Sequence, residues 1–203
     1  MKNLLKLTLV LLLLISCKDA PESKISKIAE ELMNEITGKN DNINERYDLL
    51  MKDLNTKTPL SNEQLLEAFP KKLGKLSLDS QEPRIISDKS VVGSFGADAV
   101  KMEILDAAGK NVMGAIIPLK MLHLNKITSE NNNTIRYSKK VRNGVLTFGT
   151  DRDEDTKADY QAELRFLYDN RFYVTLEGKN MSEDELWDAI NVIDLKRFKE
   201  FNK

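Results

Sequence analysis

The sequence predicts an α+β protein, in which an antiparallel meander sheet is covered by a C-terminal helix and preceded by an N-terminal helical pair. Two patterns predict this architecture. Apolar residues recur every three or four positions over residues 24–55 and again near the C-terminus, which is typical of amphipathic helices. Between these segments, apolar residues alternate with charged ones, as expected for a sheet with one polar face. We therefore expect one α+β domain over residues 56–203.

Residues 24–55 are expected to form two antiparallel amphipathic helices joined by the polar stretch 38–42. The first apolar stripe consists of Ile25, Ile28, Leu32 and Ile36, and the second of Ile43, Tyr47, Leu50 and Leu54. Ser23 is a suitable N-cap for the first helix. We expect this pair to pack against itself or against a partner, as a spacer next to a membrane.

Local signals mark further elements of the domain. A capping box of Ser61 and Gln64 predicts a short helix, and a second box of Ser182 and Glu185 predicts the C-terminal helix that covers the sheet. Asn143-Gly144 and Asp169-Asn170 are expected to form tight hairpin turns in a sheet of four to six strands. The segment 111–124 has the apolar residues of a helix, but Pro118 would kink it.

The chain opens with a segment typical of export signals: a basic head, then an apolar run from Leu7 to Ile15. The run is too short to span a bilayer, which needs roughly 20 apolar residues. It ends in Leu14-Ile15-Ser16-Cys17, which resembles the lipobox of bacterial lipoproteins. The resemblance implies cleavage between Ser16 and Cys17, diacylation of the Cys17 thiol and acylation of the new amino terminus. The alternative is an incidental thiol beside an ordinary signal cleavage site.

The resemblance divides the N-terminal region into a signal peptide, residues 1–16, and a tether, residues 17–23. Several acyl chains give the stable membrane anchoring that one chain does not. Lys18 follows the cysteine, whereas Asp at this position marks inner-membrane retention in enteric bacteria. We therefore expect a cell-envelope protein at the outer membrane, on its periplasmic face or, since "CKDAPE" is similar to the surface-export tract of lipoproteins in the Bacteroidota, at the surface.

Two longer segments, "TPLSNEQLLEAFPKKLG" and "RFYVTLEGKNMSEDELWDAI", are similar to segments of a family of small, largely uncharacterised bacterial envelope proteins. The likeness covers residues 58–203. It implies a proline-led helix before a sheet and a capped helix after the last strand. It brings no catalytic residue with it.

Composition excludes several classes of function. The chain without residues 1–16 keeps 29 Lys and Arg against 32 Asp and Glu, because Lys2 and Lys6 belong to the removed segment. Its net charge is then −3, so we expect no nucleic-acid partner. Cys17 is the single cysteine, and its acylation leaves no thiol for disulfides, thiolate metal sites or nucleophilic catalysis.

Few residues suggest chemistry. His123, the only histidine, is expected to be packed or half-buried, the alternative being a general base or metal ligand. Asp151, Asp153, Asp155 and Asp159 are spaced as at the start of a calcium-binding loop. Thr156 replaces the turn glycine of such a loop, however, and Ala162 replaces its bidentate glutamate. A solvated acidic loop is the favoured interpretation, with weak calcium binding as the alternative.

The sequence contains no Gly-x-Ser-x-Gly elbow and no phosphate-binding glycine loop, so no catalytic residue and no cofactor are assigned. Tyr173 and Trp187 are the aromatic residues that could face a ligand, although edge packing is the favoured interpretation. We expect a non-catalytic module that binds an envelope protein partner or a small ligand. The alternative is an envelope hydrolase that uses carboxylates.

Overall fold

The computed structural model describes residues 42–87, 90–125, 134–153, 158–190 and 195–202, together with the backbone of 129–132. All of these residues belong to one compact unit, Glu35–Lys203. The predicted signal peptide, the tether and the first helix of the predicted pair lie outside the described residues. No helix in the described part of the chain is long and apolar enough to cross a membrane.

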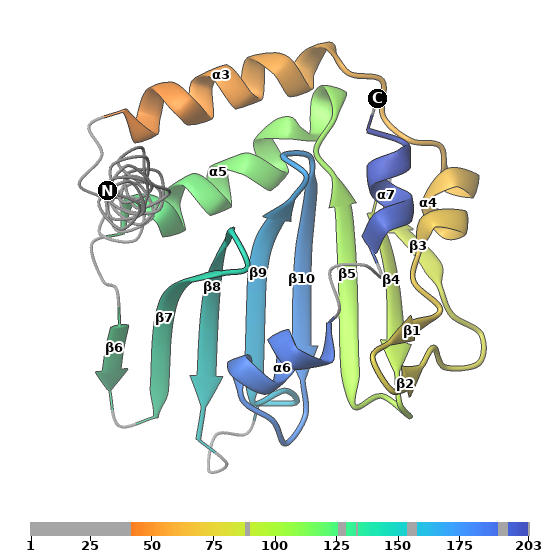
Figure 1. Ribbon diagram of the computed structural model, residues 1–203, viewed down its shortest axis with the longest axis vertical. Coiled ribbons are helices and arrows are strands. Elements are labelled where there is room, and N and C mark those ends of the chain that lie inside the picture. Colours follow the sequence, from red (N-terminus) through yellow and green to blue (C-terminus); the bar gives the residue numbers. More distant parts are fainter. Residues whose placement is uncertain are drawn as a thin grey trace, which may run out of the picture. The chain divides into compact units, whose positions relative to one another are not determined.

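Within the described residues, the sheet has eight antiparallel strands in the order β3-β4-β5-β10-β9-β8-β7-β6 (Figure 1). Their bounds are β3 Arg84–Ser87, β4 Ser90–Phe95, β5 Val100–Asp106, β6 Ser129–Asn132, β7 Ile135–Arg142, β8 Val145–Arg152, β9 Ala162–Tyr168 and β10 Phe172–Gly178. Two meanders, β3–β5 and β6–β10, meet where β5 pairs with β10. A separate two-stranded sheet consists of β1 Lys72–Leu73 and β2 Leu76–Ser77.

The α+β class and the antiparallel sheet are confirmed, but the expectation of four to six strands was too low. Strand β4 was missed because it is buried on both faces, so its residues do not alternate between apolar and charged. The predicted turns are confirmed: Asn143 and Gly144 both have positive φ, as do Asp169 and Asn170.

Six helices accompany the sheet in the described part of the chain, one of them a single 3₁₀ turn. Their bounds are α3 Ile43–Thr56, α4 Asn62–Ala68, the 3₁₀ turn η1 Gly109–Asn111, α5 Val112–Leu124, α6 Glu183–Ala189 and α7 Lys196–Glu200, with further residues outside the description between α6 and α7. Both capping boxes are present: the Ser61 and Ser182 hydroxyls accept from the N–H groups of Gln64 and Glu185, each at 3.3 Å. Segment 111–124 is helical despite Pro118.

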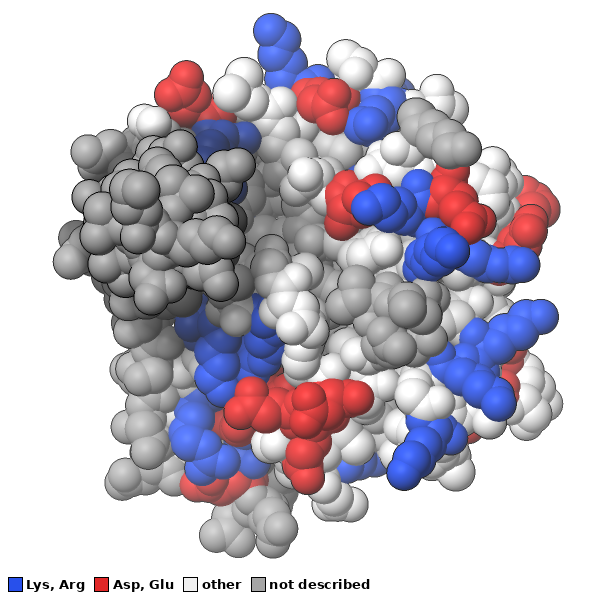
Figure 2. All heavy atoms as spheres, viewed as in Figure 1, with Lys and Arg blue, Asp and Glu red and all other residues white. Residues whose placement is uncertain are grey.

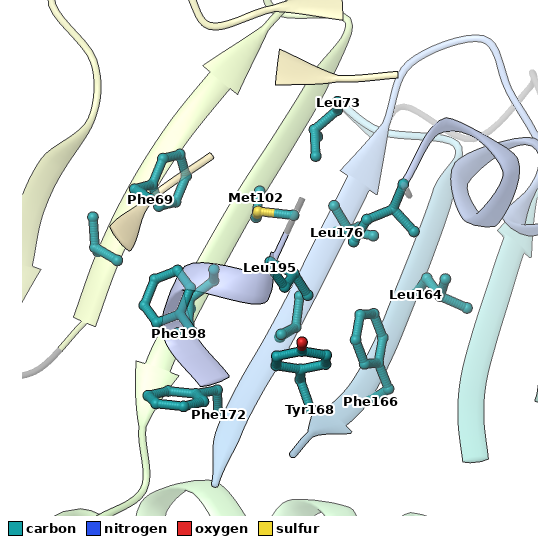
Figure 3. Close-up of a cluster of buried hydrophobic side chains, with 14 of the residues drawn as sticks. Phe69, Leu73, Met102, Leu164, Phe166, Tyr168, Phe172, Leu176, Leu195 and Phe198 are labelled. Atoms are coloured by element: carbon teal, nitrogen blue, oxygen red, sulfur yellow. The ribbon is translucent and has the colours of Figure 1, made fainter. Parts of the chain in front are cut away.

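Helices α4, α6 and α7 cover one face of the sheet, as predicted for the C-terminal helix, and enclose the main core (Figures 1 and 3). Phe198 of α7 packs on Phe172 of β10 with ring centroids 5.1 Å apart. Trp187 of α6 meets Phe166 in a T-shaped contact with ring centroids 5.7 Å apart, and it belongs to the main core and not to its edge as predicted. Phe69 after α4 stacks on Phe95 at 5.8 Å.

The opposite face of the sheet is polar over most of its area and carries a second, smaller core at one end. There, Leu54 of α3 packs with Val112, Ala115 and Ile116 of α5. Leu105, Leu167 and Tyr173 supply the sheet side of this cluster. Figure 1 shows α3 and α5 running across the sheet end that carries the β7–β8 and β9–β10 turns. Helix α3 therefore belongs to the same compact unit as the sheet.

Candidate functional site

One cavity lies between α3, α5 and the end of the sheet. Its volume is about 590 Å³, within the range of small-molecule sites. We call it the α3 pocket. It is lined by Ile43, Arg46, Tyr47, Leu49, Leu50, Leu119, His123, Gly144, Val145, Leu146, Phe148, Leu167, Asp169 and Asn170.

The pocket exists because the apolar stripe of α3 contacts α5 more closely than it contacts the sheet. Ile43 and Leu54 at the two ends of the stripe are buried. Leu50, between them, is only half-buried, and so are Leu146 and Leu167 across the pocket. Apolar side chains that face a cavity instead of one another leave apolar surface for an occupant to cover.

His123 lies in the pocket wall, in a cluster of aromatic rings. It is 3% exposed, and its Nδ1 lies 3.2 Å from the Tyr47 hydroxyl. The Tyr47 and Phe148 rings pack on the imidazole, with centroids 5.7 and 6.4 Å away. The expected packed imidazole is thus what the structure contains, although its ring also borders a cavity.

A buried lysine supports the same wall. Lys139 of β7 is 4% exposed, and its ammonium donates to the carbonyl oxygens of His123 at 2.8 Å and Asn125 at 2.6 Å. A cation at the carbonyl end of a helix is favourable. Burial lowers the pKa of Lys139. Sequence reasoning missed this residue, because an ordinary lysine in a strand gives no sign that it reaches a helix end.

The polar face of the sheet holds another depression, with a volume of about 420 Å³. It contains Glu103, Glu163 and Glu177, the acids that a carboxylate hydrolase would need. Each has a partner within the protein. The Ser90 hydroxyl donates to Glu103 at 2.8 Å, Lys101 pairs with Glu177 at 2.8 Å, and Arg152 pairs with Glu163 at 3.3 Å. This pairing favours a structural role for the three acids.

Tyr173, one of the two aromatic residues singled out in the sequence, also borders this depression. Burial raises the pKa of its hydroxyl. Its ring packs in the smaller core with α3 and α5. Tyr173 thus borders the polar depression and also packs against the smaller core.

A charged cluster joins α6 to strands β7 and β8. Figure 2 shows acidic side chains over α6 beside basic ones over β7. Glu183, only 4% exposed, accepts from the Ser138 hydroxyl, and its carboxylate pairs with Lys140 at 2.8 Å and with Arg142 at 3.4 Å. Asp184 pairs with the same two cations. The cluster holds equal numbers of acids and bases, which is typical of a structural contact.

Asp151 is attached to this cluster through the backbone, since its carboxylate accepts from the N–H of Glu183 at 2.7 Å. Burial raises the pKa of Asp151, and the nearby charge of Glu183 adds to the effect. Hydrogen bonds from Arg142 and Lys140 instead lower the pKa of Asp184. The pKa of Asp151 is thus raised and that of the neighbouring Asp184 lowered, each relative to the ordinary value of an aspartate.

The four aspartates proposed as calcium ligands do not share one set of contacts. Asp151 bonds to α6, Asp153 pairs with Arg136 at 2.8 Å, Asp159 is exposed, and Asp155 lies outside the described residues. Among the residues that the structure describes, no three Asp, Glu, His or Cys side chains converge as metal ligands. Weak calcium binding stays a prediction, as does lipidation of Cys17, which also lies outside the description together with Ser16.

In comparisons with protein-family models, with curated proteins and with solved structures, no match to this chain was found.

Proposed function

We propose that the chain is a lipid-anchored protein of the bacterial cell envelope whose α+β domain binds a small ligand in the α3 pocket without catalysing a reaction on it. Acylated Cys17 would hold the protein at the outer membrane. The export segment and the lipobox-like residues before Cys17 support the anchor.

The α3 pocket carries the binding part of the proposal. In this pocket, apolar side chains such as Leu50 and Leu167 and the polar side chain of Tyr47 line the same space. Its wall is fixed by the packing of Tyr47, His123 and Phe148 and by the buried Lys139 contacts behind them. A preformed wall lowers the entropy lost when a ligand binds. The acids that a hydrolase would use are instead paired within the sheet face.

Native mass spectrometry tests the binding. The full mature chain with Cys17→Ala, exported behind an ordinary cleavable signal and purified without detergent, is expected to carry a non-covalent small-molecule adduct. Leu146→Trp fills the pocket and should remove the adduct. Ile86→Trp places the same ring on an exposed position of β3 and should keep it. Absence of an adduct from the parent chain, or its persistence in Leu146→Trp, would contradict ligand binding in this pocket.

Intact-mass analysis of the unaltered protein from its own membranes tests the anchor. We expect a chain that begins at Cys17 and carries acyl groups. A chain that retains Met1, or an unmodified Cys17, would contradict the anchor without bearing on the pocket.

A further inference from the structure

The outward face of α5 lacks polar side chains. The exposed residues of this helix are Met113, Gly114, Pro118, Met121 and Leu124, and none of their side chains carries a charge or donates a hydrogen bond. Met113 is 59% exposed and Met121 is 65% exposed. A surface helix of a globular domain ordinarily has charged and polar residues on its outer side, and a helix that is apolar all round is ordinarily covered. The outer face of α5 is therefore suited to contact with something other than water.

The apolar residues form one stripe along α5. They follow one another at intervals of three or four positions, which places them on one side of the helix. This α5 stripe consists of Met113, Ile117, Met121 and Leu124. Lys120 is the only lysine, arginine or acid within α5, and it pairs with Asp48 of α3 at 3.0 Å. The charge beside the stripe is thus balanced within the protein.

The α5 stripe is small for a protein interface. A helix of 13 residues is about 20 Å long and about 10 Å wide, so the stripe offers about 200 Å². A stable protein interface buries about 800 Å² on each partner and contains about one hydrogen bond per 100–200 Å². A bilayer makes neither demand, because lipid tails form no hydrogen bonds and a helix satisfies its own backbone groups. The size and the chemistry of the stripe therefore favour lipid over a second copy of the chain.

The chain enters the described domain beside the α5 stripe. Helix α3 begins at Ile43, which lines the α3 pocket together with Leu119 and His123 from the last turns of α5. Figure 1 shows the start of α3 and the end of α5 on the same side of the domain. The proposed anchor, Cys17, precedes Asn42 by 25 positions. Acylation of Cys17 would keep this side near the bilayer and raise its effective concentration at the lipid surface.

We propose that the α5 stripe inserts into the surface of the phospholipid bilayer that holds Cys17, with α5 lying parallel to the membrane plane. This inference rests on the lipid anchor of the proposed function and adds a second contact between the protein and the membrane. Met113 and Met121 would lie among the upper parts of the acyl chains. Lys110 is exposed in η1 just before α5, where a lysine suits lipid phosphates. The contact would fix the orientation of the domain on the bilayer.

Fluorescence of a single NBD label tests the contact. The full mature chain with Cys17→Ala has no acyl chain and no other cysteine, so Met121→Cys supplies the only thiol for the label. With vesicles of phosphatidylethanolamine and phosphatidylglycerol in equal parts, the emission of the label at position 121 should shift to the blue and increase, because the label leaves water. Ile86→Cys places the same label at an exposed position of β3, and its emission should stay unchanged.

Sedimentation of the unlabelled chain with the same vesicles measures the affinity. Met121→Glu should weaken binding at least about tenfold, because a carboxylate loses its hydration when it enters the acyl region. Ile86→Glu is the matched control: it makes the same change from an exposed apolar residue outside α5, and it should bind as the parent does. Circular dichroism of both variants checks that the fold is kept. Binding should persist in high salt, because salt does not screen apolar contact.

Four results would overturn the inference: no response of the label at position 121, equal responses at positions 121 and 86, binding that high salt abolishes, or equal binding of Met121→Glu and the parent. A blue shift at position 121 that needs no vesicles and grows with protein concentration would identify a second copy as the occupant, and this also overturns it. Intact-mass analysis decides the anchor separately. Acylated Cys17 with a label that stays in water would leave the anchor and refute this inference, and unmodified Cys17 with vesicle binding would do the reverse.

Discussion

At the scale of single residues, Gly149 illustrates how the structure depends on an absent side chain. A Cβ at this position would overlap the carboxylate of Glu183 and contact the Ser138 hydroxyl. The glycine in β8 thus leaves the space in which Glu183 reaches Ser138 and Lys140. Position 149 has ordinary strand geometry, so close approach, and not backbone conformation, requires glycine there.

Gly149→Ala is predicted to lower the free energy of unfolding by at least about 2 kcal/mol, because Glu183 must leave its buried ion pairs. Denaturant unfolding measures the change. Gly114→Ala in α5 is the matched control, since a Cβ there meets no atom within 4 Å. It should stabilise the helix by about 0.5–1 kcal/mol. Equal effects of the two substitutions would show that Glu183 does not occupy the space above Gly149.

Asp151 gives a prediction of pH dependence. Its raised pKa means that its charge opposes folding at neutral pH, and that the penalty falls as pH drops through the folded-state pKa. Asp151→Asn keeps an oxygen that can accept from the Glu183 N–H. The variant should therefore be more stable than the parent near neutral pH, with the difference vanishing below the ordinary Asp value of 3.8.

Chemical unfolding of parent and variant between neutral pH and pH values below 3.8 measures the difference in stability. NMR titration of the Asp151 carboxyl group measures whether its pKa is raised. Asp184→Asn is the opposite case: its lowered pKa stabilises the fold above the ordinary value, and this contribution is lost as pH falls through the folded-state pKa. The Asp184 variant should lose stability near neutral pH. A gain in stability for both variants, or for neither, would refute the assignment.

At the scale of elements, one buried ion pair joins four segments. Arg171, 2% exposed, pairs bidentately with the fully buried Asp106 at the end of β5, both contacts at 2.8 Å. Arg171 also donates to the carbonyls of Thr58 before α4 and Phe201 after α7. Asp106 accepts the N–H of Leu60 at 2.8 Å. The pair thus fixes both ends of the helical cover relative to the sheet.

Asp106→Asn is predicted to cost about 3–5 kcal/mol of unfolding free energy, because it leaves the Arg171 charge buried without its counter-ion. The exposed pair Asp53–Lys57, 3.9 Å apart, offers the control: Asp53→Asn should change stability by less than about 0.5 kcal/mol. Thermal and denaturant unfolding of both variants measure the two losses of unfolding free energy. A loss below about 1 kcal/mol for Asp106→Asn would mean that the ion pair does not hold these segments.

Elements with local signals could be predicted from the sequence. The capping boxes at Ser61 and Ser182 and the turns at Asn143-Gly144 and Asp169-Asn170 depend on residues three positions apart or adjacent, so the sequence displays them directly. Strand β4 could not be found this way, because burial on both faces removes the alternation. The pairing of β5 with β10 depends on contacts across some 70 positions, such as Ile104 with Val174.

At the scale of the whole molecule, the candidate site is a product of the fold. Tyr47 and His123 contact each other across 76 positions of sequence, and Leu167 approaches them from another element. Each looks like an ordinary core residue in its own segment, as the sequence indeed suggested for His123. The α3 pocket follows only from how α3 and α5 cross the end of the sheet, which no local pattern specifies.

The most direct test of the account is an experimental structure of the full mature chain with Cys17→Ala, purified without detergent. We predict continuous density for a bound small molecule between Leu50, Leu119 and Leu167, with α3 positioned over the β7–β8 and β9–β10 turns. A pocket closed by direct packing of Leu50 on Leu146 and Leu167, or a ligand bound instead among Glu103, Glu163 and Glu177, would contradict the account.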